Sequence, residues 1–243
     1  MIELFYAPTP NGKKISIMLE EIGFEYKVTQ IKLNPGGEFS KGEQFKPEFR
    51  KISPFSKIPV IIDNDNNKEV VFESGAILMY LGEKSNKFYE QKDRTKINQW
   101  LMAQMGYVGP MLGQHHQFHR YNSGKDKWGE ERYFKITKTI YGDLDERLDQ
   151  SKYLAGENYS IADIATFPWI ARHDWHDIGL KKYKHLSRWY EIISKRPAVI
   201  KGYDVLNSGE QIGLKRLIAR PIATLCIEAQ EKHEKDEKIY VEN

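Results

Sequence analysis

The stretch that points most directly to chemistry is YAPTPNGKKI, residues 6–15, where an apolar run meets the start of a helical pattern. Two prolines fix the backbone at this junction, and the first N–H groups of a helix are free to bind a ligand there. The stretch contains no Cys, Ser, Asp or His. A pocket built here would have to work through the polar side chains at its centre, Thr9 and Asn11.

A second candidate site is FESGAI, residues 72–77, which places Glu73 and Ser74 at the start of a predicted helix. Free N–H groups and the positive end of the helix dipole favour a carboxylate at such a position, and a serine adds a hydroxyl donor. Glu73 could receive an ammonium beside it. The pair would suit the head of an α-amino acid, but Ser74 could equally be no more than the cap of its own helix.

The stretch KIPVI has Pro59 at the start of a predicted strand. Proline cannot donate to a strand ladder, so a trans proline at a sheet edge explains it, and trans bonds are much the commoner form. Alternatively, a cis turn would expose the backbone of Ile58 to pair with an extended peptide ligand. The residues alone leave both interpretations open.

Histidines gather in two places, GPMLGQHHQFH (109–119) and HDWHD (173–177). His115 and His119 lie four residues apart, a spacing that could serve a zinc ion on a helix. Neither cysteine nor a glutamate-bearing histidine pair completes a ligand set. We therefore expect no metal, and interpret both clusters as the lining of a pocket.

The first 85 residues alternate short strands and helices. A helical stripe from Ile15 to Ile22 ends at Gly23, which suits a helix C-cap, and a second helix is expected from Ser74. Residues 34–57 are rich in proline and glycine and predict a long functional loop. The expected strands are residues 2–6, 26–33, 58–63 and 69–72, the last two forming a hairpin. This order predicts an α/β domain with a mixed sheet over residues 1–85.

Strand signals stop after residue 93, and apolar residues recur at helical spacing as far as about residue 206. We predict an all-helical domain over residues 94–208. Within it, Ser160 and Asp163 of NYSIADIA form a variant of the capping box, a structural feature worth about 1 kcal/mol. Residues 209–243 form a charged C-terminal extension without a clear pattern.

The composition excludes several classes of protein. The 243 residues carry a formal net charge of only +3, which gives no electrostatic footprint for nucleic acid or an anionic membrane. No apolar run is long enough to cross a membrane, and no secretory signal opens the chain. Cys226 is the single cysteine, so an internal disulfide is excluded. We expect a cytoplasmic protein.

Taken together, APTPNG, KIP, ESGAI, GPMLGQ and NYSIADIA resemble the glutathione S-transferase superfamily, in particular its nu class. That class comprises bacterial glutathione-dependent disulfide oxidoreductases related to a fungal nitrogen-regulatory protein. The resemblance covers residues 1 to about 205. It implies a thioredoxin-like N-terminal domain, an all-helical C-terminal domain, a homodimer, and glutathione as cosubstrate.

The resemblance also implies roles for individual residues. Thr9 and Asn11 would face the sulfur of glutathione, and Gln44 would touch the peptide. Arg132 of EERY resembles an arginine that closes the site in relatives. The loop before Gln44 is longer than the family pattern, and the extension after about residue 208 has no counterpart in it.

The remaining implied contacts come from the two motifs described above. In the KIP turn, Lys57 and Ile58 would lie against the ligand, with Ile58 pairing its backbone to the cysteinyl unit beside a cis Pro59. Glu73 and Ser74 would hold the γ-glutamyl amine and carboxylate.

A site of this kind needs no cysteine of its own, because glutathione brings the thiol. The N-terminus of the first helix and a hydrogen bond from Thr9 or Asn11 would favour the thiolate. Tyr6, at the end of the first strand, is the rival donor and ranks below them. The expected reaction is glutathione-dependent disulfide reduction, with glutathione disulfide as product.

Three alternatives use the same fold. The bound thiolate could instead attack a small electrophile, as in a conjugating transferase. The chain could be a regulatory module with little activity, although the intact contact set and the absence of a long polar N-terminal extension favour an enzyme. It could also carry apolar compounds on its aromatic-rich helical domain.

Overall fold

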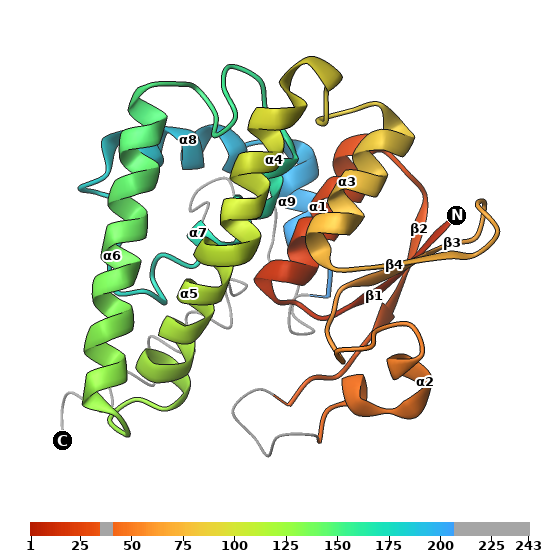
Figure 1. Ribbon diagram of the computed structural model, residues 1–243, viewed down its shortest axis with the longest axis horizontal. Helices are drawn as coiled ribbons and strands as arrows, with labels where there is room; N and C mark the ends of the chain where they lie inside the picture. Colours follow the sequence, from red (N-terminus) through yellow and green to blue (C-terminus); the bar gives the residue numbers. More distant parts are fainter. Residues whose placement is uncertain (35–40, 207–243) are drawn as a thin grey trace.

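The computed structural model describes residues 1–34 and 41–206 (Figure 1). The predicted C-terminal extension, Cys226 and part of the predicted loop lie outside the described residues. Figure 1 shows the sheet and the helices packed on it at one side, and a bundle of longer helices at the other. These two parts correspond to the predicted α/β and all-helical regions.

One four-stranded sheet organises the N-terminal part, in the order β2-β1-β3-β4. Its members are β1 (Ile2–Tyr6), β2 (Tyr26–Gln30), β3 (Val60–Asp63) and β4 (Glu69–Phe72). β1 and β2 pair in parallel, and helix α1 (Pro10–Ile22) connects them, whereas β3 pairs antiparallel with both β1 and β4. The mixed sheet, its four strands and the hairpin between β3 and β4 are confirmed.

The two-residue period of β1 divides its side chains between the faces of the sheet. Ile2, Leu4 and Tyr6 are buried in the main core with α1 and α3 (Ser74–Ser85). Phe5 points the other way and packs near Phe49.

The stretch predicted as one long loop contains two short helices, which corrects that prediction. They are η1 (Glu43–Phe45) and α2 (Pro47–Arg50). Phe49 of α2 is only 5% exposed and forms a small second core with Ile31 and Val60. The proline and glycine content concealed this element because the single apolar anchor of α2 gives no periodic signal.

Helix α1 ends at Gly23 as predicted, and it begins within the stretch 6–15, at Pro10. Thr9 is the N-cap, and its Oγ1 accepts from the backbone N–H of Gly12 at 3.2 Å. A side chain on Gly12 would collide with the carbonyl oxygen of Ala7 at 2.2 Å, so only glycine lets the strand end approach the helix so closely. Gly23 caps the other end in the left-handed conformation, with φ of 76°.

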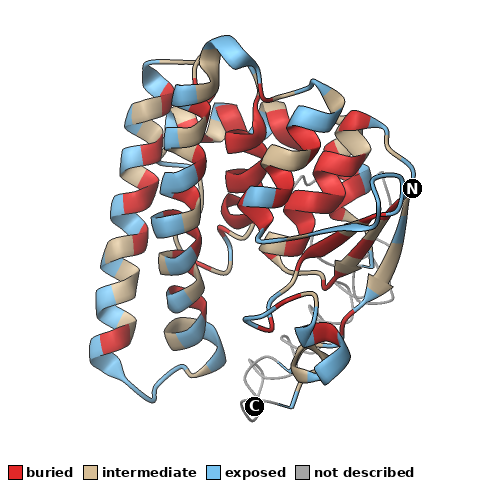
Figure 2. Cartoon of the chain, turned by 45° about the vertical axis from the view of Figure 1, so that its right-hand side comes forward, coloured by how far each residue is buried: buried red, intermediate tan, exposed pale blue. Residues whose placement is uncertain are grey.

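The second half of the described chain is helical. Its elements are η2 (Gln91–Asp93), α4 (Arg94–Ala103), the π-helix η3 (Gln104–Val108), α5 (Gly109–His115), the π-helix η4 (His116–Tyr121), α6 (Lys127–Asp149), α7 (Ile161–Ile170), α8 (Lys184–Ser194) and α9 (Pro197–Tyr203). Buried residues concentrate where these helices meet α1 and α3 (Figure 2). No helix among residues 1–34 and 41–206 is both long and apolar enough to span a bilayer.

The predicted capping box at the start of α7 is confirmed, and its carboxylate does more than cap. Asp163 is fully buried and accepts from the backbone N–H of Ser160 at 3.0 Å. It also accepts from the backbone N–H of Leu154 at 3.0 Å and from the indole N–H of Trp189 at 2.8 Å. One carboxylate thus joins α7, α8 and the loop before α7.

Helix α9 anchors the helical domain to α1. Gly202 lies against the backbone of α1, because a Cβ there would be 2.5 Å from the Cα of Ile17. Ser16 Oγ donates to the carbonyl oxygen of Gly202 at 2.6 Å, and Arg196 Nη2 donates to Glu21 Oε2 at 2.8 Å. These contacts fix the side of α1 that faces away from the ligand cleft described below.

Candidate functional site

A cleft of about 630 Å³ lies between the two domains and collects most of the predicted site residues. Its walls come from the start of α1, the segment around η1, the turn before β3, the residue before α3, and the η3–α5 segment with Trp169 of α7. It is lined by Thr9, Pro10, Asn11, Lys14, Leu33, Gln44, Ser56, Lys57, Ile58, Glu73, Gln104, Met105, Gly109, Pro110, Gly113, Gln114, Gln117 and Trp169. A smaller pocket of about 110 Å³ shares Asn11, Lys57, Ile58 and Glu73 with it and adds Pro59 and Ser74.

At the start of α1 the structure gives the cleft three kinds of donor. The backbone N–H of Asn11 lies there, since Pro10 has no N–H and those of Gly12 and Lys13 bond to Thr9, and the side chains of Thr9 and Asn11 both line the cleft. Because Thr9 Oγ1 accepts from the helix, its own hydroxyl proton is available to a ligand. Arg172, in the turn after α7, donates to the carbonyl oxygen of Pro8 at 3.2 Å and holds the loop before the helix.

The Ile58–Pro59 peptide bond is cis, so the trans interpretation of Pro59 is wrong, whereas the pairing of Ile58 with a peptide ligand stays a prediction. Ser53 supports the turn, since its Oγ donates to the carbonyl oxygen of Lys57 at 2.7 Å and accepts from the N–H of Lys57 at 2.9 Å. The turn therefore presents Ile58 to the cleft from a defined position.

At the start of α3, the structure shows that Ser74 is not the cap of its own helix, which was the simpler of its two interpretations. Glu73, not Ser74, is the N-cap residue, and no side chain caps this helix. Glu73 has φ of 70°, a conformation that is unusual for a residue with a side chain and is often retained at binding sites. Ser74 is the first residue of the helix, is 3% exposed, and has its Oγ beside Lys14 Nζ at 3.2 Å.

Three buried polar atoms that line the cleft have no hydrogen-bond partner: Gln44 Oε1, Gln104 Nε2 and Trp169 Nε1. The last two approach one point, because a Cβ on Gly109 would lie 2.7 Å from Gln104 Nε2 and 3.3 Å from Trp169 Nε1. Buried donors without partners are costly, and these two N–H groups lie close together beside Gly109 in the wall of the cleft.

Sequence reasoning missed Lys14, Gln104 and Trp169 as lining residues. Lys14 lies one helical turn before Met18 on the buried side of α1, and Gln104 interrupts an otherwise apolar stripe. A polar residue on the buried face of a helix can be recognised in the sequence in both cases. Trp169 stands in a fully apolar run and gave none.

Two other predicted or rival residues lie elsewhere. Arg132 on α6 is exposed, stacks over the ring of Trp128 and does not line the cleft. Tyr6 is fully buried on the α1 side of the sheet and donates to the carbonyl oxygen of Val205 at 2.9 Å. Burial raises the pKa of Tyr6 above its ordinary value, which favours the protonated form.

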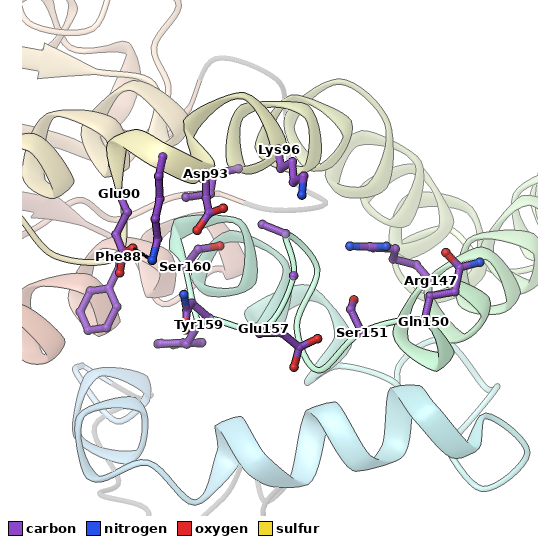
Figure 3. Close-up of a pocket in the computed structure, with 15 residues that line it drawn as sticks. Phe88, Glu90, Asp93, Lys96, Arg147, Gln150, Ser151, Glu157, Tyr159 and Ser160 are labelled. Carbon is purple, nitrogen blue, oxygen red and sulfur yellow. Dashed lines mark ion pairs between the residues drawn. The ribbon is translucent and has the colours of Figure 1, made fainter.

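A second cavity of about 520 Å³ lies on another part of the helical domain, where residues before α4 meet the end of α6 and the loop that follows it. Figure 3 shows side chains of both charge signs around it, including Asp93, Lys96, Arg147 and Glu157. Neither the start of α1 nor the turn before β3 contributes to it, so we place the chemistry in the first cleft.

The histidines do not line this cleft, which corrects the pocket interpretation. Four of them, His115, His116, His173 and His176, are buried in the helical core, where His116 Nε2 lies 2.8 Å from His176 Nε2 and the hydroxyl of Tyr141 lies 2.7 Å from His176 Nδ1. His119 is partly exposed, and its Nε2 lies 2.6 Å from Asp177 Oδ2. Within residues 1–34 and 41–206, no group of three His, Cys, Asp or Glu residues is arranged to hold a metal ion. Burial lowers the pKa of His115 to about 4 and that of His116 to about 3.

Because these histidines are buried in the neutral form, we expect acid to lower the free energy of unfolding of the protein. A histidine that is neutral when folded but titrates near 6.5 when unfolded costs about 1.4 kcal/mol for each pH unit below 6.5, until the folded pKa is reached. We expect the free energy of unfolding to fall between pH 6.5 and 4. His115→Phe should weaken this dependence in urea titrations, because His115 stacks on Phe134 and neither of its nitrogens has a partner.

Two family models match successive parts of the chain. The glutathione S-transferase N-terminal domain matches residues 2–83, and the glutathione S-transferase C-terminal domain matches residues 111–197. The disulfide-bond oxidoreductase YfcG of Escherichia coli is 44% identical over 204 residues, which cover 82% of this chain and 92% of YfcG. The transcriptional regulator URE2 of Saccharomyces cerevisiae is 30% identical over 236 residues, covering 79% of this chain and 64% of URE2.

Solved structures agree with these matches. A glutathione transferase from Burkholderia graminis, with two glutathione molecules bound per subunit, superposes with a TM-score of 0.78 at 37% identity, covering 86% of this chain and 89% of its own. A glutathione transferase from Pseudomonas putida, with one glutathione disulfide bound per subunit, gives a TM-score of 0.76 at 39% identity, covering 84% and 91%.

A third family model, the prokaryotic dksA/traR C4-type zinc finger, matches residues 207–235, outside the described part. A C4 site needs four cysteine ligands, and this stretch contains only Cys226. The residues present therefore do not fit such a zinc site.

Proposed function

The chain belongs to the glutathione S-transferase superfamily, and from that premise we propose that it is a glutathione-binding enzyme that reduces disulfide bonds by thiol–disulfide exchange. The observation that carries the proposal is a cleft in which a helix N-terminus meets Thr9 and Asn11, while none of the described residues that line it is a cysteine. Such a cleft can stabilise a thiolate but must receive it from a ligand. The identity to YfcG over most of both chains points to the same reaction.

The proposed step is an in-line exchange between sulfurs. The glutathione thiolate attacks the glutathione sulfur of a mixed disulfide, so that one S–S bond forms as another breaks. The products are glutathione disulfide and a second thiolate, which takes a proton from solvent. The attacking glutathione sulfur is oxidised from thiolate to disulfide, and the sulfur of the leaving thiol is reduced from disulfide to thiolate. The glutathione sulfur that is attacked stays at the disulfide level, so the exchange needs no other oxidant or reductant.

The cleft offers contacts for both halves of that product. We assign the first glutathione to Thr9, Asn11, the KIP turn and the start of α3, as the family resemblance implies. Gln44 would touch its peptide, with the unpartnered Oε1 as acceptor. The second half would use the two unpartnered N–H donors beside Gly109, a proposal supported by relatives that bind two glutathiones or one glutathione disulfide. Arg132 is kept as a proposed closing residue that would have to reach the cleft by moving.

Steady-state kinetics test the proposal. The protein should reduce a mixed disulfide of glutathione and a small thiol, forming one glutathione disulfide per turnover in an assay coupled to glutathione reductase. Glutathione disulfide binding without turnover would indicate a regulatory module. Conjugation of an electrophile without disulfide reduction would indicate a transferase.

Ser74→Ala should weaken glutathione binding about tenfold, because it removes one hydroxyl donor to a charged carboxylate. We expect kcat to change little, since this contact is remote from the sulfur. Calorimetric titration with glutathione measures the affinity. Ser85→Ala at the far end of α3 is the matched control, as Ser85 Oγ bonds only within its own helix. Equal affinities in the Ser74→Ala variant and the wild type would remove Ser74 from the site.

We also propose a homodimer and a cytoplasmic location. Phe55, beside the cleft, is 72% exposed, and Phe72 on the edge strand β4 is 37% exposed, both unusual for solvated aromatic side chains. A reductase that draws on glutathione requires a compartment that keeps glutathione reduced. Light scattering after size-exclusion chromatography tests the dimer.

A further inference from the structure

Lys14 is a buried lysine at the wall of the cleft. It is 1% exposed, and its Nζ donates to Gln104 Oε1 at 2.6 Å and to Ser74 Oγ at 3.2 Å. The sulfur of Met105 is its third neighbour, at 3.4 Å. Each of the three N–H bonds of the ammonium can therefore point to one of these acceptor atoms.

No ion pair compensates this buried charge among the residues that the structure describes. Around Lys14 Nζ, the start of α3 contributes Ser74, the residue before it is Glu73, and η3 contributes Gln104 and Met105. Of these only Glu73 is charged, and its charge acts on Lys14 without an ion pair within the described part of the chain. A buried ammonium without a carboxylate partner is costly, so the charged form of Lys14 lacks an anionic partner in the free protein.

The two hydrogen bonds of Lys14 orient groups that face the cleft. Because Ser74 Oγ accepts from Lys14, its own proton can be donated to a ligand; its other neighbour is the weakly accepting Met105 sulfur at 3.6 Å. Gln104 Oε1 is likewise held by Lys14, which turns the amide N–H groups toward Gly109.

We propose that Lys14 is a positioning residue that takes up a proton when the γ-glutamyl carboxylate binds at Ser74. The ammonium then balances the negative charge of the carboxylate, with Ser74 as the bridge between the two groups. This rests on the proposed function, because it assumes that glutathione binds in this cleft. The ligand carboxylate completes the charge balance that the free protein leaves open.

The protonation state of the free protein agrees with this geometry. Burial lowers the pKa of Lys14 to about 7, and the charge of Glu73 opposes the shift only in part. A carboxylate held at Ser74 raises that pKa toward its ordinary value near 10.5. Affinity for a glutathione analogue should therefore fall by up to tenfold per pH unit above pH 7.

Proton uptake on binding is the direct test. S-methylglutathione is the probe, because its thioether cannot ionise. Titration calorimetry at pH 8 in buffers with different ionisation enthalpies should show uptake of about 0.9 proton per bound probe by the wild type. Lys14→Met should bind more weakly with uptake close to zero, a readout that a purely structural lysine would not change.

Lys13→Met is the matched control. Lys13 is equally buried on the same helix but lies over the ring of Tyr203 at 3.5 Å and does not line the cleft. It should keep the wild-type uptake. Binding of the probe by wild type with no proton uptake overturns the inference about Lys14 and leaves the proposed function standing. Failure of the wild type to bind the probe at any pH contradicts both, and the wild-type measurement decides even if Lys14→Met does not fold.

Discussion

Replacing Thr9 and Asn11 together by alanine is expected to lower kcat/KM for a glutathione mixed disulfide by about 100-fold. Both side chains line the cleft at the start of α1, where a charge-assisted hydrogen bond to sulfur contributes about 1.5–3 kcal/mol. Loss of that contribution raises the thiol pKa of bound glutathione and reduces the thiolate fraction. Initial rates at several glutathione concentrations separate this loss from weaker binding.

Two substitutions give this prediction its controls. Thr9→Ser keeps both the hydroxyl and the cap on Gly12, so it should retain most of the activity. Asn11→Asp keeps the shape but places a carboxylate near the sulfur, and it should lose more activity than Asn11→Ala. Wild-type turnover in the double alanine variant would contradict the mechanism.

The largest effect on stability is expected from Asp163→Ala. This change leaves three buried N–H donors, those of Leu154, Ser160 and Trp189, without their acceptor. We expect the free energy of unfolding to fall by about 3–5 kcal/mol and Tm to fall by about 10 °C. Urea denaturation followed by circular dichroism measures it.

Asp126→Ala is the matched comparison. Asp126 is the N-cap of α6 and accepts from the N–H of Gly129 at 3.1 Å, but it is exposed and joins no other element. Its loss should cost about 1 kcal/mol, the usual value of a cap. Equal losses in the two variants would show that Asp163 acts only as a cap.

Local sequence signals predicted the elements well, because caps, strand period and helical stripes are properties of neighbouring residues. Gly23 and the Ser160–Asp163 box mark helix ends as expected. Helix α2 was missed because four residues carry no period. The long-range role of Asp163 was missed because Trp189 lies 26 residues away in the chain.

The site was predictable mainly through family resemblance. Composition and spacing left open the isomer of Pro59, whether Ser74 caps its helix, and the direction of Tyr6, and each was decided by tertiary packing. The histidines show the opposite error: polar residues close in sequence suggested a pocket, whereas the fold buries them in a core. Lys14 needed the structure, because its partners come from α3 and η3.

The most direct test of the central claim is the thiol pKa of glutathione bound to the protein, measured by ultraviolet difference titration of thiolate absorbance. We expect it to lie well below the ordinary thiol value of about 8.5, and to rise toward that value in the Thr9→Ala/Asn11→Ala variant. A bound thiol that titrates like free glutathione would show that the helix start and its two donors do not activate the sulfur, and the account would be wrong.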